Sequence, residues 1–299
     1  MPSRLPRALA LMSIALLAAC TGAAAPSPSA APSTAACDIQ NPPTKTPDKL
    51  TVGADNPAFS PYFEPMDGGN TEPWDPEQGD PNSGKGFESA VAYAVAEKLG
   101  FAREDVTWIP LPFANSFAPG PKEFDVYLSQ VSYSPEREQN VDLSDGYYFG
   151  NQAVVVADDS ELADATTISE LKEARFGAQT ATTSFRAIEE VIEPTAGASV
   201  YDSNDAAIEA LQAGQIDAIV VDLPTAFYIT NVQAEDTAVI GQIGPEVGAE
   251  QEYFSLVLEK DSPLTDCVNE AIRVLAEDGT LDSLVAEWLP DDTVPVLEP

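Results

Sequence analysis

The sequence predicts an α/β protein in which short apolar strands alternate with helices. Apolar runs of strand length occur throughout the chain, for example at 50–55 and 217–221. Between them lie segments with apolar residues at helical spacing, of which 86–99 is the clearest. Strands joined by crossover helices are typical of largely parallel sheets. About 260 residues follow Cys37, enough for two lobes of ordinary size.

The first half of the chain is divided by its Gly and Pro residues. The stretch 56–85 is rich in Pro, Gly and Asp and is predicted as a loop, although its acidic run at 75–80 leaves calcium binding as an alternative. The helix 86–99 carries Phe87, Val91, Val95 and Leu99 on one face, and Gly100 ends it. Strands are predicted at 50–55, 106–109 and 124–128.

The second half continues the same alternation. Strands are predicted at 152–157, 176–178, 199–201, 217–221 and 254–258. Helices are predicted at 169–174, 184–192, 204–213, 224–230, 263–276 and 281–288.

The charge balance excludes several classes of function. The chain has 14 basic and 49 acidic residues, a formal net charge of −35. Nucleic-acid binding needs clustered Lys and Arg, so no nucleic-acid partner is expected. The chain has no histidine. This removes Ser-His-Asp and Cys-His nucleophile systems and the commonest metal ligand, and no metal or cofactor is expected.

The first residues are predicted to be a processing segment. Arg4 and Arg7 precede an apolar run at 8–17 that is too short to span a bilayer. The run ends in Leu17-Ala18-Ala19-Cys20, which resembles a bacterial lipobox. Cleavage before Cys20 would leave a lipidated cysteine and anchor the protein outside the cell membrane. An ordinary secretory signal, cut near Ala25, is the alternative.

The two remaining cysteines, Cys37 and Cys267, are expected in an oxidising compartment. A disulfide between them is the simplest prediction, and two unpaired thiols are the alternative. The stretch 21–36 contains only Thr, Gly, Ala, Pro and Ser and is predicted to be a tether.

The stretch 129–137 concentrates groups suited to binding a small carboxylate. Hydroxyls at Ser129, Ser132 and Ser134 follow a predicted strand, and Ser134-Pro135 is a helix-start signal. Arg137 adds a guanidinium fork, which can hold a carboxylate through two hydrogen bonds. The alternative is a surface turn in which Arg137 pairs with Glu136 or Glu138.

Five segments carry a resemblance to a known family. They are 52–55, 86–100, 132–148, 177–184 and 213–222. In order and spacing they resemble the extracytoplasmic amino-acid-binding proteins of ABC importers, solute-binding protein family 3, over about 49–290.

The resemblance implies a two-lobed, periplasmic-binding-protein-like (type II) α/β fold with two hinge crossings, near 149–152 and 248–253. The implied division is a signal peptide at 1–19, a lipidated cysteine and tether at 20–48, lobe 1 at 49–148 plus 252–290, and lobe 2 at 153–246.

The implied function is to bind a polar L-amino acid between the lobes and deliver it to permease subunits, as a monomer and not as an enzyme. Two alternatives stay open. One is a sensor that signals to a membrane partner. The other is a dehydratase on the same scaffold, for which Asp55, Glu88 or Asp222 would have to act as acid or base.

The resemblance also implies roles for single residues. Arg137 would clamp the ligand carboxylate, with Thr182 and Thr183 meeting it from the other lobe. Asp222 would take the α-ammonium, helped by Ser132 or by the backbone near Ser129, although Asp222 could instead cap a helix.

Further residues are implied around the rest of the ligand. Phe59 and Phe113 would form aromatic walls, with core or loop packing as the alternative. Asp55 and Gln130 would face the ligand side chain. The chain departs from the family at Ala181, where glycine is usual, and in a long insertion at 67–84 that could cover one side of the cleft.

Overall fold

The computed structural model describes residues 41–291 and 293–299. The predicted signal peptide, Cys20 and Cys37 lie outside the described residues. Residues just before the first strand are bonded to lobe 1, since the Lys45 backbone N–H donates to Asp125 (2.7 Å) and Lys45 Nζ pairs with Glu259 (2.7 Å).

The first sheet has five strands in the order β2-β1-β3-β12-β4. Their bounds are β1 Leu50–Ala54, β2 Val106–Pro110, β3 Val126–Tyr127, β4 Val141–Leu143 and β12 Val257–Glu259. β1 runs parallel to β2 and β3, whereas β12 runs antiparallel to β3 and β4.

The second sheet repeats this pattern in the order β10-β6-β9-β7-β8. Its strands are β6 Gln152–Ala157, β7 Phe176–Gln179, β8 Ala198–Tyr201, β9 Ala218–Asp222 and β10 Thr237–Ile243. β7 runs parallel to β8 and β9, and β6 runs antiparallel to β9 and β10. Each sheet is therefore the centre of one lobe.

The expectation of largely parallel sheets is wrong, because both sheets are mixed. β6 and β12 enter their sheets directly from a crossing between the lobes instead of through a helix, so they run against their neighbours. Periodicity missed β4, β5 and β10, and the strand predicted at 254–258 is divided between β11 and β12.

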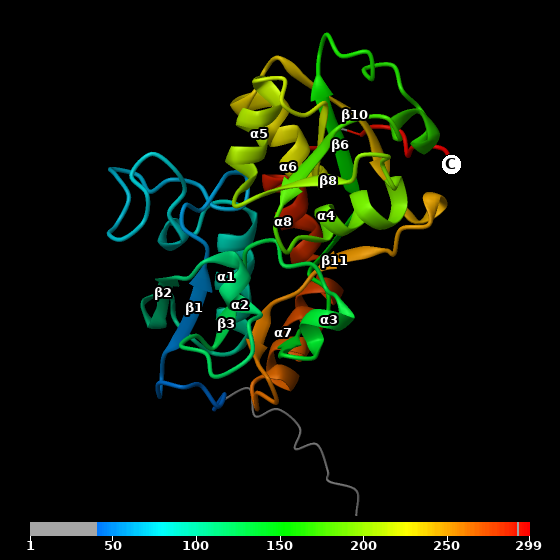
Figure 1. The fold of residues 1–299 in the computed structure, drawn as a ribbon. Helices are drawn as coiled ribbons and strands as arrows, with labels where there is room; N and C mark the ends of the chain where they lie inside the picture. Colours follow the sequence, from blue (N-terminus) through cyan, green and yellow to red (C-terminus); the bar gives the residue numbers. More distant parts are fainter. Residues whose placement is uncertain (1–40, 292) are drawn as a thin grey trace, which may run out of the picture. The chain divides into compact units, whose positions relative to one another are not determined.

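The two crossings pair with each other as a short antiparallel ribbon. β5 (Tyr148–Gly150) pairs with β11 (Glu252–Phe254), and Phe149 lies opposite Tyr253. In Figure 1, β11 is the labelled orange strand. The two-lobed α/β fold with two hinge crossings is thus confirmed.

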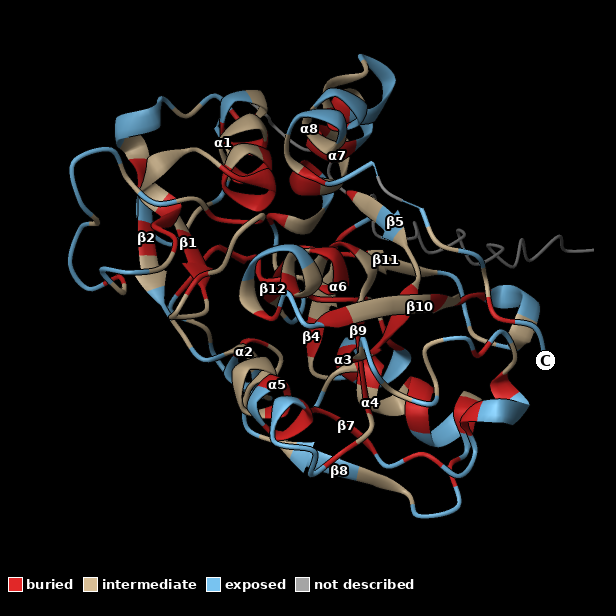
Figure 2. Ribbon diagram, turned by 90° about the horizontal axis from the view of Figure 1, so that it is seen from above, coloured by how far each residue is buried: buried red, intermediate tan, exposed pale blue. Residues whose placement is uncertain are grey.

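The α-helices of lobe 1 in the described part of the chain lie where the sequence predicted them, except α2, which was not predicted. They are α1 Phe87–Lys98, α2 Phe113–Ser116, α3 Pro135–Glu138, α7 Thr265–Glu277 and α8 Thr280–Trp288. Gly86, the N-cap residue before α1, has φ +90° and lies against the Tyr62 backbone where a Cβ would not fit. Its buried face contains Phe87, Val91 and Val95. Figure 2 shows these inner helix faces and the central strands as the buried parts of the chain.

The second lobe has three α-helices in the described part, α4 Thr183–Ala187, α5 Asn204–Gln212 and α6 Leu223–Tyr228. Thr182 caps α4 by accepting from the Phe185 N–H (3.1 Å), and Ser203 caps α5 by accepting from the Ala206 N–H (3.2 Å). α4 and α6 each continue as a π-helical turn, at Ile188–Ile192 and Ile229–Gln233. None of the described helices has the length and apolar character to span a bilayer.

The insertion at 67–84 is organised around a buried carboxylate. Asp80 is fully buried and accepts from the backbone and hydroxyl of Thr71 (both 2.7 Å) and from the Asn82 N–H (2.9 Å). The Asp80 carboxylate oxygens therefore already accept hydrogen bonds from within the loop. No residue of 67–84 lines the cavity described below as the candidate site, although the preceding residues 56–59 do.

The C-terminal tail connects the cores of both lobes. Leu289, after α8, is buried in the lobe 1 core, whereas Leu297 is buried in the lobe 2 core. The Leu297 N–H donates to the Gln242 carbonyl of β10 (2.9 Å), and the Gln242 N–H donates to the Pro295 carbonyl (2.9 Å). In Figure 1 the C-terminus lies beyond β10.

Replacing Leu297 by alanine should lower the free energy of unfolding by about 2–5 kcal/mol, because a buried leucine would leave a cavity against Gly241. Urea unfolding measures this change. Val200→Ala, at a residue that is 55% exposed, is the control and should cost less than about 0.5 kcal/mol. Equal stability of Leu297→Ala and wild type would mean that the tail does not contribute to the lobe 2 core.

Candidate ligand-binding site

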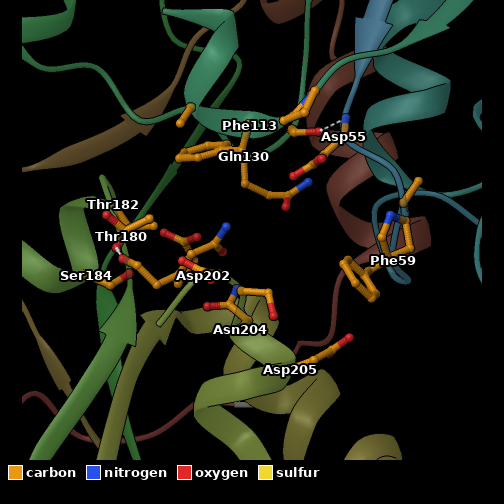
Figure 3. Close-up of a pocket in the computed structure, with 18 of the residues that line it drawn as sticks. Asp55, Phe59, Phe113, Gln130, Thr180, Thr182, Ser184, Asp202, Asn204 and Asp205 are labelled. Carbon is orange, nitrogen blue, oxygen red and sulfur yellow. Dashed lines mark hydrogen bonds between the residues drawn. The ribbon is translucent and has the colours of Figure 1, made fainter. Parts of the chain in front are cut away.

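A cavity of about 340 Å³ is lined by residues of both lobes. Figure 3 shows Asp55, Phe59, Phe113 and Gln130 on the lobe 1 side, and Thr180, Thr182, Ser184, Asp202, Asn204 and Asp205 on the lobe 2 side. Of the ten predicted ligand residues, nine line this cavity: Asp55, Phe59, Phe113, Ser129, Gln130, Arg137, Thr182, Thr183 and Asp222. Ser132 is not among the lining residues.

Arg137 is a buried cation that bonds to both lobes. It is 6% exposed, and its guanidinium donates to the carbonyl of Ser132 in lobe 1 and to that of Ala181 in lobe 2 (2.9 Å for the latter). Burial lowers the pKa of Arg137 to about 10, opposed by the negative charges of Glu252 and Asp222. The guanidinium therefore stays charged at neutral pH.

Aromatic rings and a helix cap hold Arg137 in place. Its guanidinium carbon lies 4.5 Å from the centre of the Phe117 ring and 5.4 Å from that of Phe113. Ser134 caps α3 by accepting from the Arg137 N–H (3.2 Å), as the helix-start signal predicted. The alternative of a surface turn is wrong, because the exposed Glu136 pairs instead with Arg186 (2.9 Å).

Ala181 occupies a backbone position that favours glycine. Its φ is +62°, in the left-handed region. For a residue with a Cβ this conformation costs roughly 1–2 kcal/mol. The carbonyl of this strained residue is the one that accepts from Arg137, so the departure from glycine falls at a direct contact between the lobes.

The predicted pair Thr182 and Thr183 divides into two roles. The Thr182 hydroxyl donates to the Gln179 carbonyl (2.7 Å) and accepts from Phe185, so it serves the helix cap. The Thr183 hydroxyl lies 3.3 Å from the Ser132 hydroxyl of lobe 1. Ser132, although not lining the cavity, therefore contacts a residue that does.

Asp222 ends β9 and belongs to a cluster of polar side chains. The Gln152 amide nitrogen donates to Asp222 Oδ1 (2.7 Å) and also to a carboxylate oxygen of Glu252 in β11. Asp222 does not accept a helix-capping hydrogen bond through its side chain, although it precedes α6. The capping alternative is therefore not observed.

Desolvation and, after it, the neighbouring Glu252 charge raise the pKa of Asp222 to about 8, although the Gln152 hydrogen bond and the Arg137 charge act in the opposite direction. Sequence reasoning missed Gln152 and Glu252, since isolated Gln and Glu residues next to hinge strands carry no recognisable signal.

Asp55 and Gln130 lie at the other end of the cavity. The Asp55 N–H donates to the Ser129 hydroxyl (2.9 Å), which fixes the end of β1 to the segment after β3. Burial raises the pKa of Asp55, whereas hydrogen bonds from the backbone of Asn56 and Phe113 lower it by less. Gln130 has φ +49° and is held from behind by Glu88.

Glu88 is a fully buried carboxylate that supports the site without lining it. It accepts from the Gln130 backbone N–H (2.7 Å), from the Gln130 side chain and from the Tyr147 hydroxyl. Burial raises the pKa of Glu88 to about 7 despite these three donors. It therefore positions Gln130 from the first turn of α1.

Four further lining residues lie just before and at the start of α5: Asp202, Ser203, Asn204 and Asp205. The chain between β8 and α5 brings them to the lobe 2 side of the cavity (Figure 3). The sequence predicts here only the start of a helix at 204–213, so the place of this stretch at the site follows from the tertiary structure.

Comparison with known proteins gives the same family as the sequence resemblance. The chain matches the family described as bacterial extracellular solute-binding proteins, family 3, over residues 69–291. It is 27% identical over 209 residues to the arginine-binding extracellular protein ArtP of Bacillus subtilis, which covers 68% of this chain and 77% of ArtP. It is 27% identical over 216 residues to the L-cystine-binding protein TcyJ of Escherichia coli, which covers 72% of this chain and 78% of TcyJ.

Solved structures show the same two-lobed fold. The arginine-, lysine-, histidine-binding protein ArtJ of Geobacillus stearothermophilus superimposes with a TM-score of 0.64 at 25% identity, covering 81% of this chain and 97% of ArtJ. The ancestral amino acid-binding protein AncCDT-1, described as a precursor of cyclohexadienyl dehydratase, gives a TM-score of 0.63 at 25% identity, covering 81% and 96%. The curated relatives are binding proteins and not enzymes.

Ionisation of Glu88 should make stability depend on pH. Because burial raises its pKa, its contribution is complete below about pH 4.5 and is lost as the pH rises through about 7. Between pH 4.5 and 8 the free energy of unfolding of wild type should therefore fall by about 3 kcal/mol relative to Glu88→Gln. Urea unfolding at several pH values measures this difference. Glu97→Gln, at an exposed position of the same helix, is the control, and a constant difference for Glu88→Gln would contradict the prediction.

Proposed function

Because this chain belongs to the bacterial extracellular solute-binding proteins, family 3, we propose that it binds one L-amino acid in the cavity and delivers it to the permease subunits of an ABC importer. The observation that carries the proposal is the placement of Arg137 and Asp222, from different lobes, on the wall of one cavity. Both charges of a zwitterion then have an oppositely charged partner on the cavity wall.

The carboxylate end of the ligand is assigned to Arg137 and Thr183. Arg137 is the cationic residue among the side chains that line the cavity, and two of its five N–H groups already donate to carbonyls. The remaining donors and the Thr183 hydroxyl can receive a carboxylate, and charge-assisted bonds of this kind are the strong ones.

The ammonium end is assigned to Asp222. It lies on the lobe 2 sheet beside Gln152 and Glu252, so the ligand would contact lobe 1 through Arg137 and lobe 2 through Asp222. A ligand that contacts both lobes favours the closed arrangement by its difference in affinity for the two states.

The side-chain end favours a cation. The charged residues lining the cavity are Arg137 and four aspartates: Asp55, Asp202, Asp205 and Asp222. Once Arg137 and Asp222 bind the ligand backbone, three carboxylates remain with neutral Gln130 and Asn204. We therefore assign an amino acid with a cationic side chain, in line with the arginine bound by ArtP.

The location at the cell surface is part of this proposal. The family is extracellular, and a lipidated Cys20 would keep the protein at the outer face of the membrane as a monomeric receptor. The proposed Cys37–Cys267 disulfide would fix the start of the folded part to α7, where Cys267 is buried.

A titration with single amino acids tests the ligand class. L-Arginine and L-lysine should bind and raise the melting temperature, whereas L-glutamate should not, because three carboxylates would face its side chain. Calorimetry gives the affinities. Binding of L-glutamate in preference to L-arginine would overturn the assignment of the side-chain end, and binding of no amino acid would overturn the function.

Replacing Arg137 by alanine tests the carboxylate end. Removing one partner of a buried charge pair costs roughly 2–5 kcal/mol, so Kd should weaken by about 30-fold to several thousand-fold. Arg273→Ala, at an exposed residue of α7, is the control and should leave Kd unchanged. A loss below about threefold in Arg137→Ala would place the carboxylate elsewhere.

A further inference from the structure

The side-chain amide of Gln130 is held at one end inside lobe 1. Gln130 follows Ser129 after β3 and lines the cavity. Its amide nitrogen donates to Oε2 of Glu88, and its backbone N–H donates to Oε1 of the same carboxylate (2.7 Å). Two hydrogen bonds to one charged group therefore fix both the backbone and the side chain of Gln130.

The other end of the amide, its carbonyl oxygen, is open to the cavity. In the described part of the chain, the buried side-chain atoms without a hydrogen-bond partner are Oε1 of Gln152 and Oγ of Ser255. The Gln130 oxygen accepts no hydrogen bond from the described residues either, so it is not buried. Figure 3 shows Gln130 extending into the space between the lobe 1 and lobe 2 residues that line the cavity.

The groups around Glu88 disfavour the reverse orientation of this amide. The Glu88 carboxylate is fully buried and receives three donors, of which the third is the Tyr147 hydroxyl. Turning the Gln130 amide would place its oxygen against a carboxylate oxygen, with no hydrogen between the two acceptors. Buried acceptors that lose their donor are costly, so the carboxylate at position 88 decides which end of the amide faces the cavity.

The Gln130 oxygen and Asp55 give this side of the cavity two acceptors (Figure 3). A guanidinium or ammonium group on a ligand side chain can donate to both. A ligand carboxylate would meet acceptors and no donor from these two groups, and would be repelled by Asp55.

We propose that Glu88 is a positioning residue for ligand specificity, because it holds the Gln130 nitrogen and so makes the Gln130 oxygen the acceptor for an N–H donor at the end of the ligand side chain. The inference rests on the proposed function and adds the residue that orients this part of the site. Glu88 does not line the cavity, so it acts on the ligand through Gln130.

Glu88→Gln tests the inference because it should reverse the Gln130 amide. The Gln130 backbone N–H cannot turn, so the introduced amide must keep its oxygen there and direct its nitrogen at the Gln130 side chain. The Gln130 oxygen then accepts from that nitrogen and leaves the cavity.

Calorimetry at pH 8, above the pKa of about 7 to which burial raises Glu88, measures the effect on L-arginine binding. In Glu88→Gln, Kd should weaken by about 10- to 100-fold, the range for a hydrogen bond to a charged group. Glu97→Gln, at an exposed residue of the same helix, is the control and should bind as wild type. An unchanged Kd in Glu88→Gln would overturn the inference.

Gln130→Met separates positioning from charge, since the buried Glu88 charge could also attract a cationic ligand directly. Gln130→Met alone should weaken Kd for L-arginine. In that variant, adding Glu88→Gln should change Kd by less than about twofold, because no amide remains to be turned. A further loss of tenfold or more would show that Glu88 acts by its charge, and would overturn the inference while leaving the proposed function intact.

An NMR measurement without ligand tests the orientation independently of binding. The Gln130 side-chain amide signals are those that disappear in Gln130→Met. In wild type at pH 8, one of these protons should exchange with water at least about tenfold more slowly than those of the exposed Gln139, and Glu88→Gln should abolish the difference. Equally fast exchange in wild type would overturn the inference even if L-arginine binds. Slow exchange in a protein that binds no amino acid would instead overturn the proposed function.

Discussion

The contact on which the site depends is made by one buried guanidinium. Arg137 starts from a single helical turn in lobe 1, yet one of its bonds ends on the Ala181 carbonyl of lobe 2. A buried cation is costly unless it is bonded and balanced by charge. The rings of Phe113 and Phe117, two carbonyls and the acidic residues beyond them meet this requirement.

The remaining charges of the site can be understood from that cation. In a chain with a net charge of −35, carboxylates are abundant, and four aspartates line the cavity. The cavity wall therefore has one cationic side chain, Arg137, and four aspartates, which suits a ligand with one carboxylate and more than one positive group. Gln152, between Asp222 and Glu252, links this polarity to the hinge ribbon.

The two lobes are also connected outside the site. The hydroxyls of Tyr62 in lobe 1 and Thr225 in lobe 2 lie 3.0 Å apart, and Arg186 of lobe 2 pairs with Glu136 of lobe 1. The C-terminal tail also passes from the core of lobe 1 to that of lobe 2. Tertiary packing rather than local preference stabilises these contacts. They involve residues separated by long stretches of chain, and none belongs to a periodic pattern.

The sequence by itself determined the α/β class, the positions of most helices and most of the predicted ligand-binding residues. This was possible because periodicity, caps and turn residues act over a few positions of the chain. Ser134 before Pro135 is one example, and nine of the ten predicted ligand residues line one cavity. Only the tertiary structure decided the antiparallel course of β6 and β12, the arrival of Asp202 and Asp205 at the site, and the meeting of Glu252 with Asp222. These depend on strand pairing and hinge geometry between distant segments, which leave no local pattern in the chain.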